Sequence, residues 1–130
     1  MVGLKPSFGR VPPWPLGTFA DVAVLGPLIR TVRDSALLLN VLARLDLRDP
    51  FCLPPDSCST PRDWRDGIED GLAGLRIAVL RQPAIPVPMG FAANALPRAV
   101  PLAAGLYRDD LVLRGARTLE LAQPFAVAKQ

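Results

Sequence analysis

The chain has 130 residues, 50% of them hydrophobic, and a formal net charge of +3. This length favours a single domain, and the hydrophobic content excludes a chain kept unfolded by high charge and low hydrophobicity. The 15 prolines and 10 glycines confine helices and strands to a few short windows, because each proline removes a backbone donor.

The charge pattern argues against two classes of partner. Arginines alternate with aspartates, as in residues 62–66, and do not gather in one basic run, so we expect no nucleic-acid partner. The apolar stretch 83–107 is interrupted by prolines and cannot form a continuous spanning helix, so we expect no membrane partner. The first residues lack the pattern of a secretion signal, and we expect a cytoplasmic location.

The first predicted helix covers residues 31–43. Thr31 is its expected cap, and Asp34 completes an arrangement similar to a capping box. Apolar residues occupy nearly all sides of this helix; they are Val32, Ala36, Leu37, Leu38, Leu39, Val41, Leu42 and Ala43. Such a helix needs neighbours on several sides, and we expect some of them to be missing from a chain this short.

Three short apolar runs predict strands, at residues 76–80, 84–87 and 99–102. The few residues between the first two permit a hairpin and exclude a helical crossover. A second helix is predicted from Asp109 or Asp110 to Ala122, before Pro124. Its apolar stripe consists of Val112, Leu113, Ala116, Leu119 and Ala122, whereas Arg114 and Arg117 lie away from its centre. Strands mixed with helices favour an α/β class.

Residues 2–11 read Val-Gly-Leu-Lys-Pro-Ser-Phe-Gly-Arg-Val, and residues 25–39 carry Gly26-Pro27, Arg30 and Asp34 ahead of leucines. These motifs resemble the amidase signature family. Residues 1–80 are similar to the segment that follows the family's signature, and residues 83–127 to its far C-terminal strand, turn and last helix. The resemblance implies a single truncated amidase-like domain over 1–130. Its expected fold is a partial amidase-signature-type fold with a short mixed sheet and two main helices, in which the long middle of an amidase is missing. Ala95 replaces the family's usual glycine in the turn.

The family's chemistry comes from a lysine and two serines that precede the segment resembled by residues 2–11. The sequence starts at Met1, so the resemblance gives these three residues no counterpart here. We therefore expect no catalytic, cofactor-binding or metal-binding residue in this chain, and no cofactor.

The rest of the chain agrees with that expectation. It contains no histidine, which excludes Ser-His-Asp and Cys-His catalysis by this chain alone and leaves its two cysteines short of a zinc site. Ser7 is the serine nearest to a lysine, Lys5. It corresponds to a family position that is not the nucleophile, so a hydroxyl that stabilises a turn is the simpler interpretation against a catalytic one.

The carboxylates have two interpretations each. Asp109 and Asp110 are adjacent, and capping of the last helix explains them more simply than a site. The acidic residues near Trp64 could bind a cation, although a charged surface turn or helix accounts for them as well; they are Asp63, Asp66, Glu69 and Asp70.

Three functions remain open at this point. The first is a remnant of an amidase that is inactive alone and whose parent hydrolyses amide bonds by serine acylation. The second is the scaffold half of a split amidase, completed by a complementary amidase polypeptide. The third is a small interaction module that uses the apolar helix 31–43 to bind another protein. The expected partner is a complementary amidase polypeptide, or else the chain self-associates. We favour the first.

Overall fold

The computed structural model describes residues 1–19, 22–53, 63–75, 84–91 and 97–124. Strand β1 (Val2–Gly3) pairs with β2 (Leu28–Ile29), and helix α1 (Val32–Leu42) follows directly. Strands β3 (Ala84–Phe91) and β4 (Pro97–Ala103) form a second pair, and helix α2 (Asp109–Ala122) comes last. Both pairs are antiparallel, so the described strands form two small sheets beside two helices. The predicted α/β class with two main helices is confirmed.

Helix α1 begins where the sequence predicts. The Thr31 backbone is extended, and its hydroxyl oxygen accepts from the Asp34 backbone N–H at 3.1 Å. The Asp34 carboxylate accepts the Thr31 hydroxyl proton at 2.6 Å. The return bond therefore involves the hydroxyl and not the backbone N–H of a standard capping box. Both groups stabilise the start of the helix, and the predicted range 31–43 is confirmed.

The pair β3–β4 shows how the proline-rich sequence still forms strands. Ile85 and Val87 are fully buried, whereas Pro86 between them is exposed and lies opposite Pro101. In a two-stranded sheet each strand has an outer edge that needs no backbone donor, so prolines are tolerated there. The predicted strands 84–87 and 99–102 are confirmed as parts of β3 and β4.

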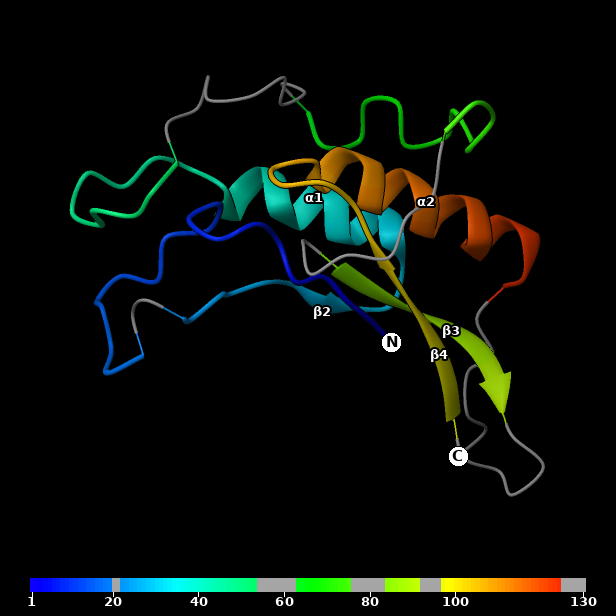
Figure 1. Cartoon of the computed structure of the whole chain (residues 1–130), viewed down its shortest axis with the longest axis horizontal. Helices are drawn as coiled ribbons and strands as arrows, with labels where there is room; N and C mark the ends of the chain where they lie inside the picture. The colour runs from blue at the N-terminus through cyan, green and yellow to red at the C-terminus, as the bar shows by residue number, and fades with distance from the viewer. Residues whose placement is uncertain (20–21, 54–62, 76–83, 92–96, 125–130) are drawn as a thin grey trace.

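The two helices lie side by side and run in opposite directions, with β3 against α2 and β1 against β3 (Figure 1). A glutamate joins them, because the Glu120 carboxylate near the end of α2 accepts from the Val32 backbone N–H at 3.2 Å. The apolar core lies between these elements and includes Val2, Leu4, Val32, Ala36, Leu39, Ile85, Val87, Val112, Leu113 and Ala116. Each buried valine, leucine or isoleucine side chain of this core contributes about 1.5–3 kcal/mol by its burial.

Two predictions fall outside the described residues. They are the strand at 76–80, together with its junction to 84, and the turn at Ala95. The second helix, predicted from Asp109 or Asp110 to Ala122, is confirmed as α2.

Candidate functional site

The segment that follows β1 enters the interior of the molecule. Leu4, Pro6, Ser7 and Arg10 are all buried, although two of them are polar. Gly9 has a φ of +76°, and a Cβ atom at this position would collide with the backbone carbonyl of Phe51. Only glycine fits such a left-handed turn so close to another backbone, and this turn brings Ser7 and Arg10 inside together.

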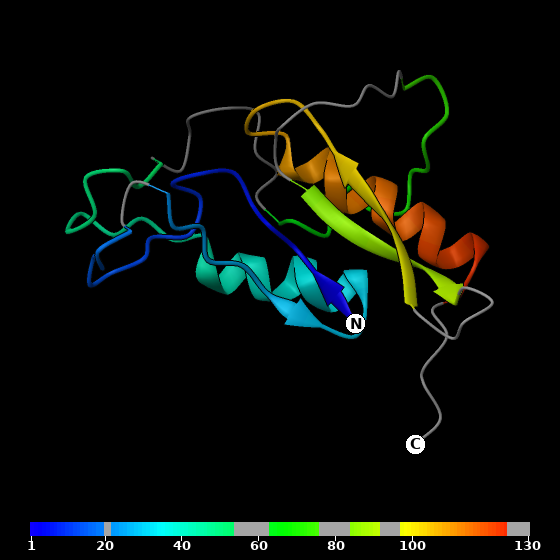
Figure 2. The ribbon, with the colours of Figure 1, turned by 60° about the horizontal axis from the view of Figure 1, so that its bottom comes forward.

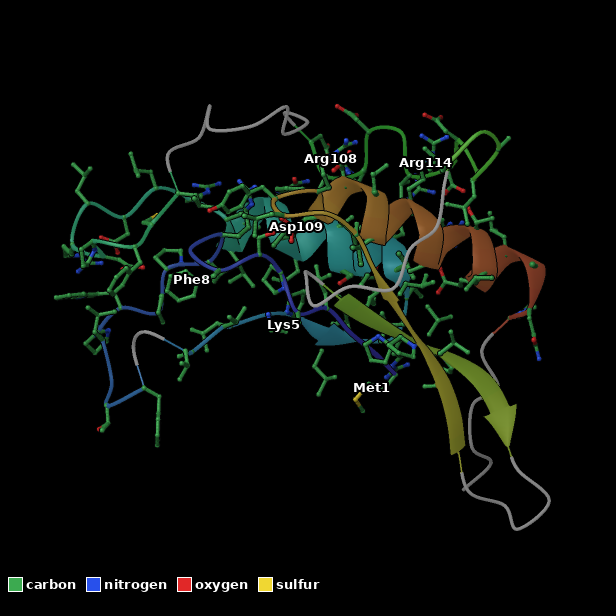
Figure 3. All side chains as sticks on the ribbon, viewed as in Figure 1. Met1, Lys5, Phe8, Arg108, Asp109 and Arg114 are labelled. Atoms are coloured by element: carbon green, nitrogen blue, oxygen red, sulfur yellow. The ribbon has the colours of Figure 1, made fainter. Side chains whose placement is uncertain are left out.

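Asp109 is the residue that binds this segment to helix α2. Its carboxylate has no exposed surface and accepts from the Ser7 backbone N–H at 2.6 Å and from the Arg10 Nε–H at 3.3 Å. The Ser7 hydroxyl in turn accepts from the Tyr107 backbone N–H at 3.1 Å. Figure 3 shows Asp109 at the start of α2, next to the N-terminal segment. These bonds join residues about one hundred positions apart, and we call Ser7, Arg10, Tyr107 and Asp109 the junction.

Arg10 makes the junction a buried ion pair. Its side chain is almost wholly enclosed, and its guanidinium carbon lies 5.2 Å from the centre of the Trp64 ring. Aromatic faces attract cations, and this attraction is stronger where water is excluded. Within the described residues, one terminal nitrogen of Arg10 is buried without a hydrogen-bond partner. A buried charge is costly unless it is paired, so Asp109 and Trp64 are the groups that keep Arg10 inside.

Trp64 is held in place from helix α1. The Asn40 side-chain oxygen accepts from the Trp64 backbone N–H at 2.8 Å, and the Asn40 amide donates to Asp63 at 2.6 Å. The neighbouring Arg65 holds the pKa of the Asp63 carboxyl well below its usual range by hydrogen bonding to it, so this carboxylate stays charged. The junction is thus connected to both helices and to the turn at 63–70.

The prediction that Asp109 and Asp110 cap the last helix is wrong. Arg108 is the N-cap residue of α2 and makes no side-chain capping bond. The Asp109 carboxylate instead accepts hydrogen bonds from Ser7 and Arg10. Pairing a buried arginine stabilises the fold by more than a helix cap, which contributes about 1 kcal/mol. Asp110 forms an ion pair with Arg108 at 2.7 Å, and this bond raises the pKa of Arg108.

The chemistry that the junction can perform is limited to positioning. The Ser7 hydroxyl oxygen accepts from a backbone amide, and Asp109 contacts the Ser7 backbone N–H. Lys5, two residues away in sequence, is exposed while Ser7 is buried. Activation of a serine requires a base within hydrogen-bond reach of its hydroxyl, and the described residues bring no lysine amine to this one.

The acidic residues near Trp64 take part in a network of charged contacts. Asp63 pairs with Arg65, and Glu69 pairs with Arg117 at 2.9 Å. Arg114 donates to the backbone carbonyls of Asp70 and Gly71. In the described ranges, no three His, Cys, Asp or Glu residues gather as a metal site. The geometry is that of a charged turn fastened to α2.

Comparison with known proteins gives a match over the first two thirds of the chain. A family model described as Amidase matches residues 1–89, which include β1, β2, α1 and most of β3. The chain belongs to the Amidase family. Of the junction, Ser7 and Arg10 fall inside the match, and Tyr107 and Asp109 fall beyond it.

The similar curated proteins are much longer than this chain. It is 43% identical over 83 residues to a glutamyl-tRNA(Gln) amidotransferase subunit of Ligilactobacillus salivarius, a match that covers 63% of the chain and 16% of that protein. It is 44% identical over 79 residues to the corresponding protein of Salinibacter ruber, with 60% and 15% covered. The comparison with solved structures gave no significant match. In the described part of the chain, no helix is both long and apolar enough to cross a membrane.

Sequence reasoning missed the pairing of Arg10 with Asp109. The available signal was weak: an arginine within the most family-like segment and an aspartate at the first position of a helix. Both residue types are common on surfaces, and only the three-dimensional structure shows that these two side chains are buried together and paired.

Proposed function

We propose that this chain is the scaffold half of a split amidase, the second of the three functions considered above. The complete enzyme acts on carbon–nitrogen amide bonds, and this chain is inactive on its own, as in the first of those functions. In this proposal, residues 1–130 form one truncated domain. Residues 1–80 correspond to the segment after the family's signature, and residues 83–127 to the far C-terminal segment. The family's lysine and two serines are supplied from outside these residues.

The observation that carries this proposal is the environment of Ser7. It is the serine in the most family-like segment, yet it is buried and its hydroxyl accepts a hydrogen bond from the Tyr107 backbone. A nucleophile needs an accessible oxygen and an adjacent base. Ser7 has the contacts of a structural residue, which supports a role in shaping the scaffold around residues 2–11.

A complementary amidase polypeptide is the partner that fits this role. The match covers 16% of the Ligilactobacillus salivarius protein, so a protein of that kind has many residues that could pack against this part. That protein is named as one subunit of an amidotransferase. We propose that the present chain works in the same way, as one piece of a larger amide-processing assembly.

The test is an assay of amide hydrolysis by the purified chain, with Ser7→Ala as its matched variant. We expect no release of ammonia from simple carboxamides by either protein, because neither supplies a lysine–serine relay. Turnover by the wild-type chain that Ser7→Ala abolishes would falsify the proposal. Turnover that survives in Ser7→Ala would also overturn it, because it would locate a nucleophile elsewhere in the chain.

A further inference from the structure

The side of α1 away from the core carries apolar residues that the described part of the chain leaves open to solvent. Leu37 and Val41, one turn apart on this helix, are 48% and 56% exposed. Their row continues back to the exposed Arg33. The opposite side of α1 is buried, with Val32, Ser35, Ala36 and Leu39 turned inward. We call Leu37 and Val41 the outer face of α1, and in Figure 2 this helix lies below α2.

A hollow adjoins the outer face at the start of the helix. It has a volume of about 570 Å³ and is lined by Met1, Leu28, Ile29, Arg30 and Asp34. Met1 and Leu28 are 77% and 67% exposed, so part of its wall consists of apolar side chains in contact with water, beside the charged Arg30 and Asp34. Asp34 lies one turn before Leu37, which makes the hollow and the outer face neighbours on one surface.

We propose that the hollow and the outer face of α1 together bind the complementary amidase polypeptide, through an apolar segment flanked by carboxylates. This inference rests on the proposed function. Large exposed apolar patches with a polar rim mark contact surfaces in soluble proteins. All of these residues lie within the Amidase match at 1–89, and the relatives that share this region are far longer. The additional residues of these relatives, which have no counterpart in this chain, are those expected to cover this surface.

The charged residues around this surface indicate which kind of partner fits it. Arg30, Arg33 and Arg44 are exposed beside it, and none of them takes part in the ion pairs formed among the described residues. The Asp34 carboxylate is bonded to the Thr31 hydroxyl. Complementary charges speed association, whereas like charges facing each other oppose it. A second copy would bring the same arginines to the same rim, so a partner with carboxylates at its edge fits better.

The experiment uses co-expression with a defined probe. The probe is the Ligilactobacillus salivarius amidotransferase protein from which the 83 residues similar to this chain have been deleted. We expect the wild-type chain to be recovered with it as a soluble complex. The double variant Leu37→Glu/Val41→Glu should bind at least about tenfold more weakly, because two carboxylates would replace the apolar side chains of the contact and would face the carboxylates of the partner. Glutamate is a good helix former, so the variant should keep α1 intact.

Leu121→Glu is the matched control. Leu121 is an exposed leucine of α2, with 56% of its surface accessible, and it lies outside the proposed surface. We expect this variant to bind the probe as the wild type does. Reversal of the rim charges in Arg30→Glu/Arg33→Glu should slow association, with a larger effect at low salt than at high salt.

The possible failures are distinguishable. If the wild type captures the probe and Leu37→Glu/Val41→Glu captures it equally well, this surface is not the contact and only the present inference is overturned. If the wild type leaves the probe insoluble and unbound, the scaffold function itself is overturned. Sedimentation of the chain alone provides a separate check: a dimer that dissociates in the double variant would identify a second copy as the occupant and contradict the inference.

Discussion

The two helices differ in how completely this chain surrounds them. Helix α2 is buried on its apolar side by β3, and its polar side is crossed by the turn that ends near Gly71, to which Arg114 donates. Figure 3 shows Arg108 and Arg114 on that outer side. Helix α1 is buried on one side and keeps the exposed Leu37 and Val41 on the other. Among the described residues, the apolar side of α2 is therefore covered around Val112, Leu113 and Ala116, whereas α1 keeps exposed apolar residues along its middle.

Removal of the carboxylate at the start of α2 should have the largest effect. In Asp109→Ala, the Arg10 guanidinium stays buried without its counter-charge and the Ser7 backbone N–H loses its acceptor. We expect a loss of about 3–5 kcal/mol of unfolding free energy, which is much of the stability of a small domain. Denaturant unfolding followed by tryptophan fluorescence measures it.

The neighbouring aspartate is the control for that experiment. Asp110 pairs with Arg108 near the surface, so Asp110→Ala should cost about 0–1 kcal/mol. Equal losses in the two variants would mean that the buried junction does not hold the N-terminal segment to α2.

A pair of leucine truncations compares the two helices directly. Leu113 of α2 is fully buried, so Leu113→Ala should cost about 2–5 kcal/mol. Leu37 of α1 is half exposed, and Leu37→Ala should stay within about 0.5 kcal/mol. The same denaturant titration provides both values. A large loss in Leu37→Ala would show that the outer face of α1 is covered in the isolated chain, and would remove the contrast between the helices.

The sequence predicted the helices well because their signals are local. Thr31 and Asp34 stand next to the helix that they cap, and Pro124 stands just beyond the end of α2. The apolar residues on all sides of α1 also predicted that some of its neighbours are missing, and Leu37 and Val41 are the apolar residues of α1 that the structure leaves most exposed. Signals of this kind require only a few consecutive residues.

The junction could not be predicted for the opposite reason. The Arg10–Asp109 pair depends on the turn at Gly9, the position of α2 and the packing of Trp64. An aspartate at the first turn of a helix usually serves the helix dipole, and no local pattern separates that role from a buried ion pair. The resemblance to amidases identified the family from residues 2–11 but gave no role to Asp109.

Removal of the contact between the end of α2 and the start of α1 should have an intermediate effect on the free energy of unfolding. The Glu120 carboxylate accepts from the Val32 backbone N–H and also binds Arg117 at 2.9 Å. Glu120→Ala leaves the first N–H of α1 without this acceptor, and we expect a loss of about 1–2 kcal/mol. Faster amide hydrogen exchange at Val32 should accompany it. Glu69→Ala removes only the more exposed partner of Arg117 and should cost about 0–1 kcal/mol. A smaller loss in Glu120→Ala than in Glu69→Ala would show that the helices are not joined at this point.

The smallest effect on stability is expected from the Asp46–Arg48 pair in the loop that follows α1. Hydrogen bonds from the side chain and backbone of Arg48 lower the pKa of Asp46 from 3.8 to about 2. Because the folded-state pKa lies below the unfolded value, the pair stabilises the loop above about pH 4 and this contribution is lost as the pH falls towards 2. In Arg48→Ala the side-chain bonds are lost and the backbone bond remains, so the pKa of the Asp46 carboxyl should rise towards its ordinary value, as followed by its carbon chemical shift in NMR. The global unfolding midpoint should hardly move, because the pair is exposed to solvent and screened by it. A midpoint near 4 in the wild-type chain would show that the pair does not persist in solution.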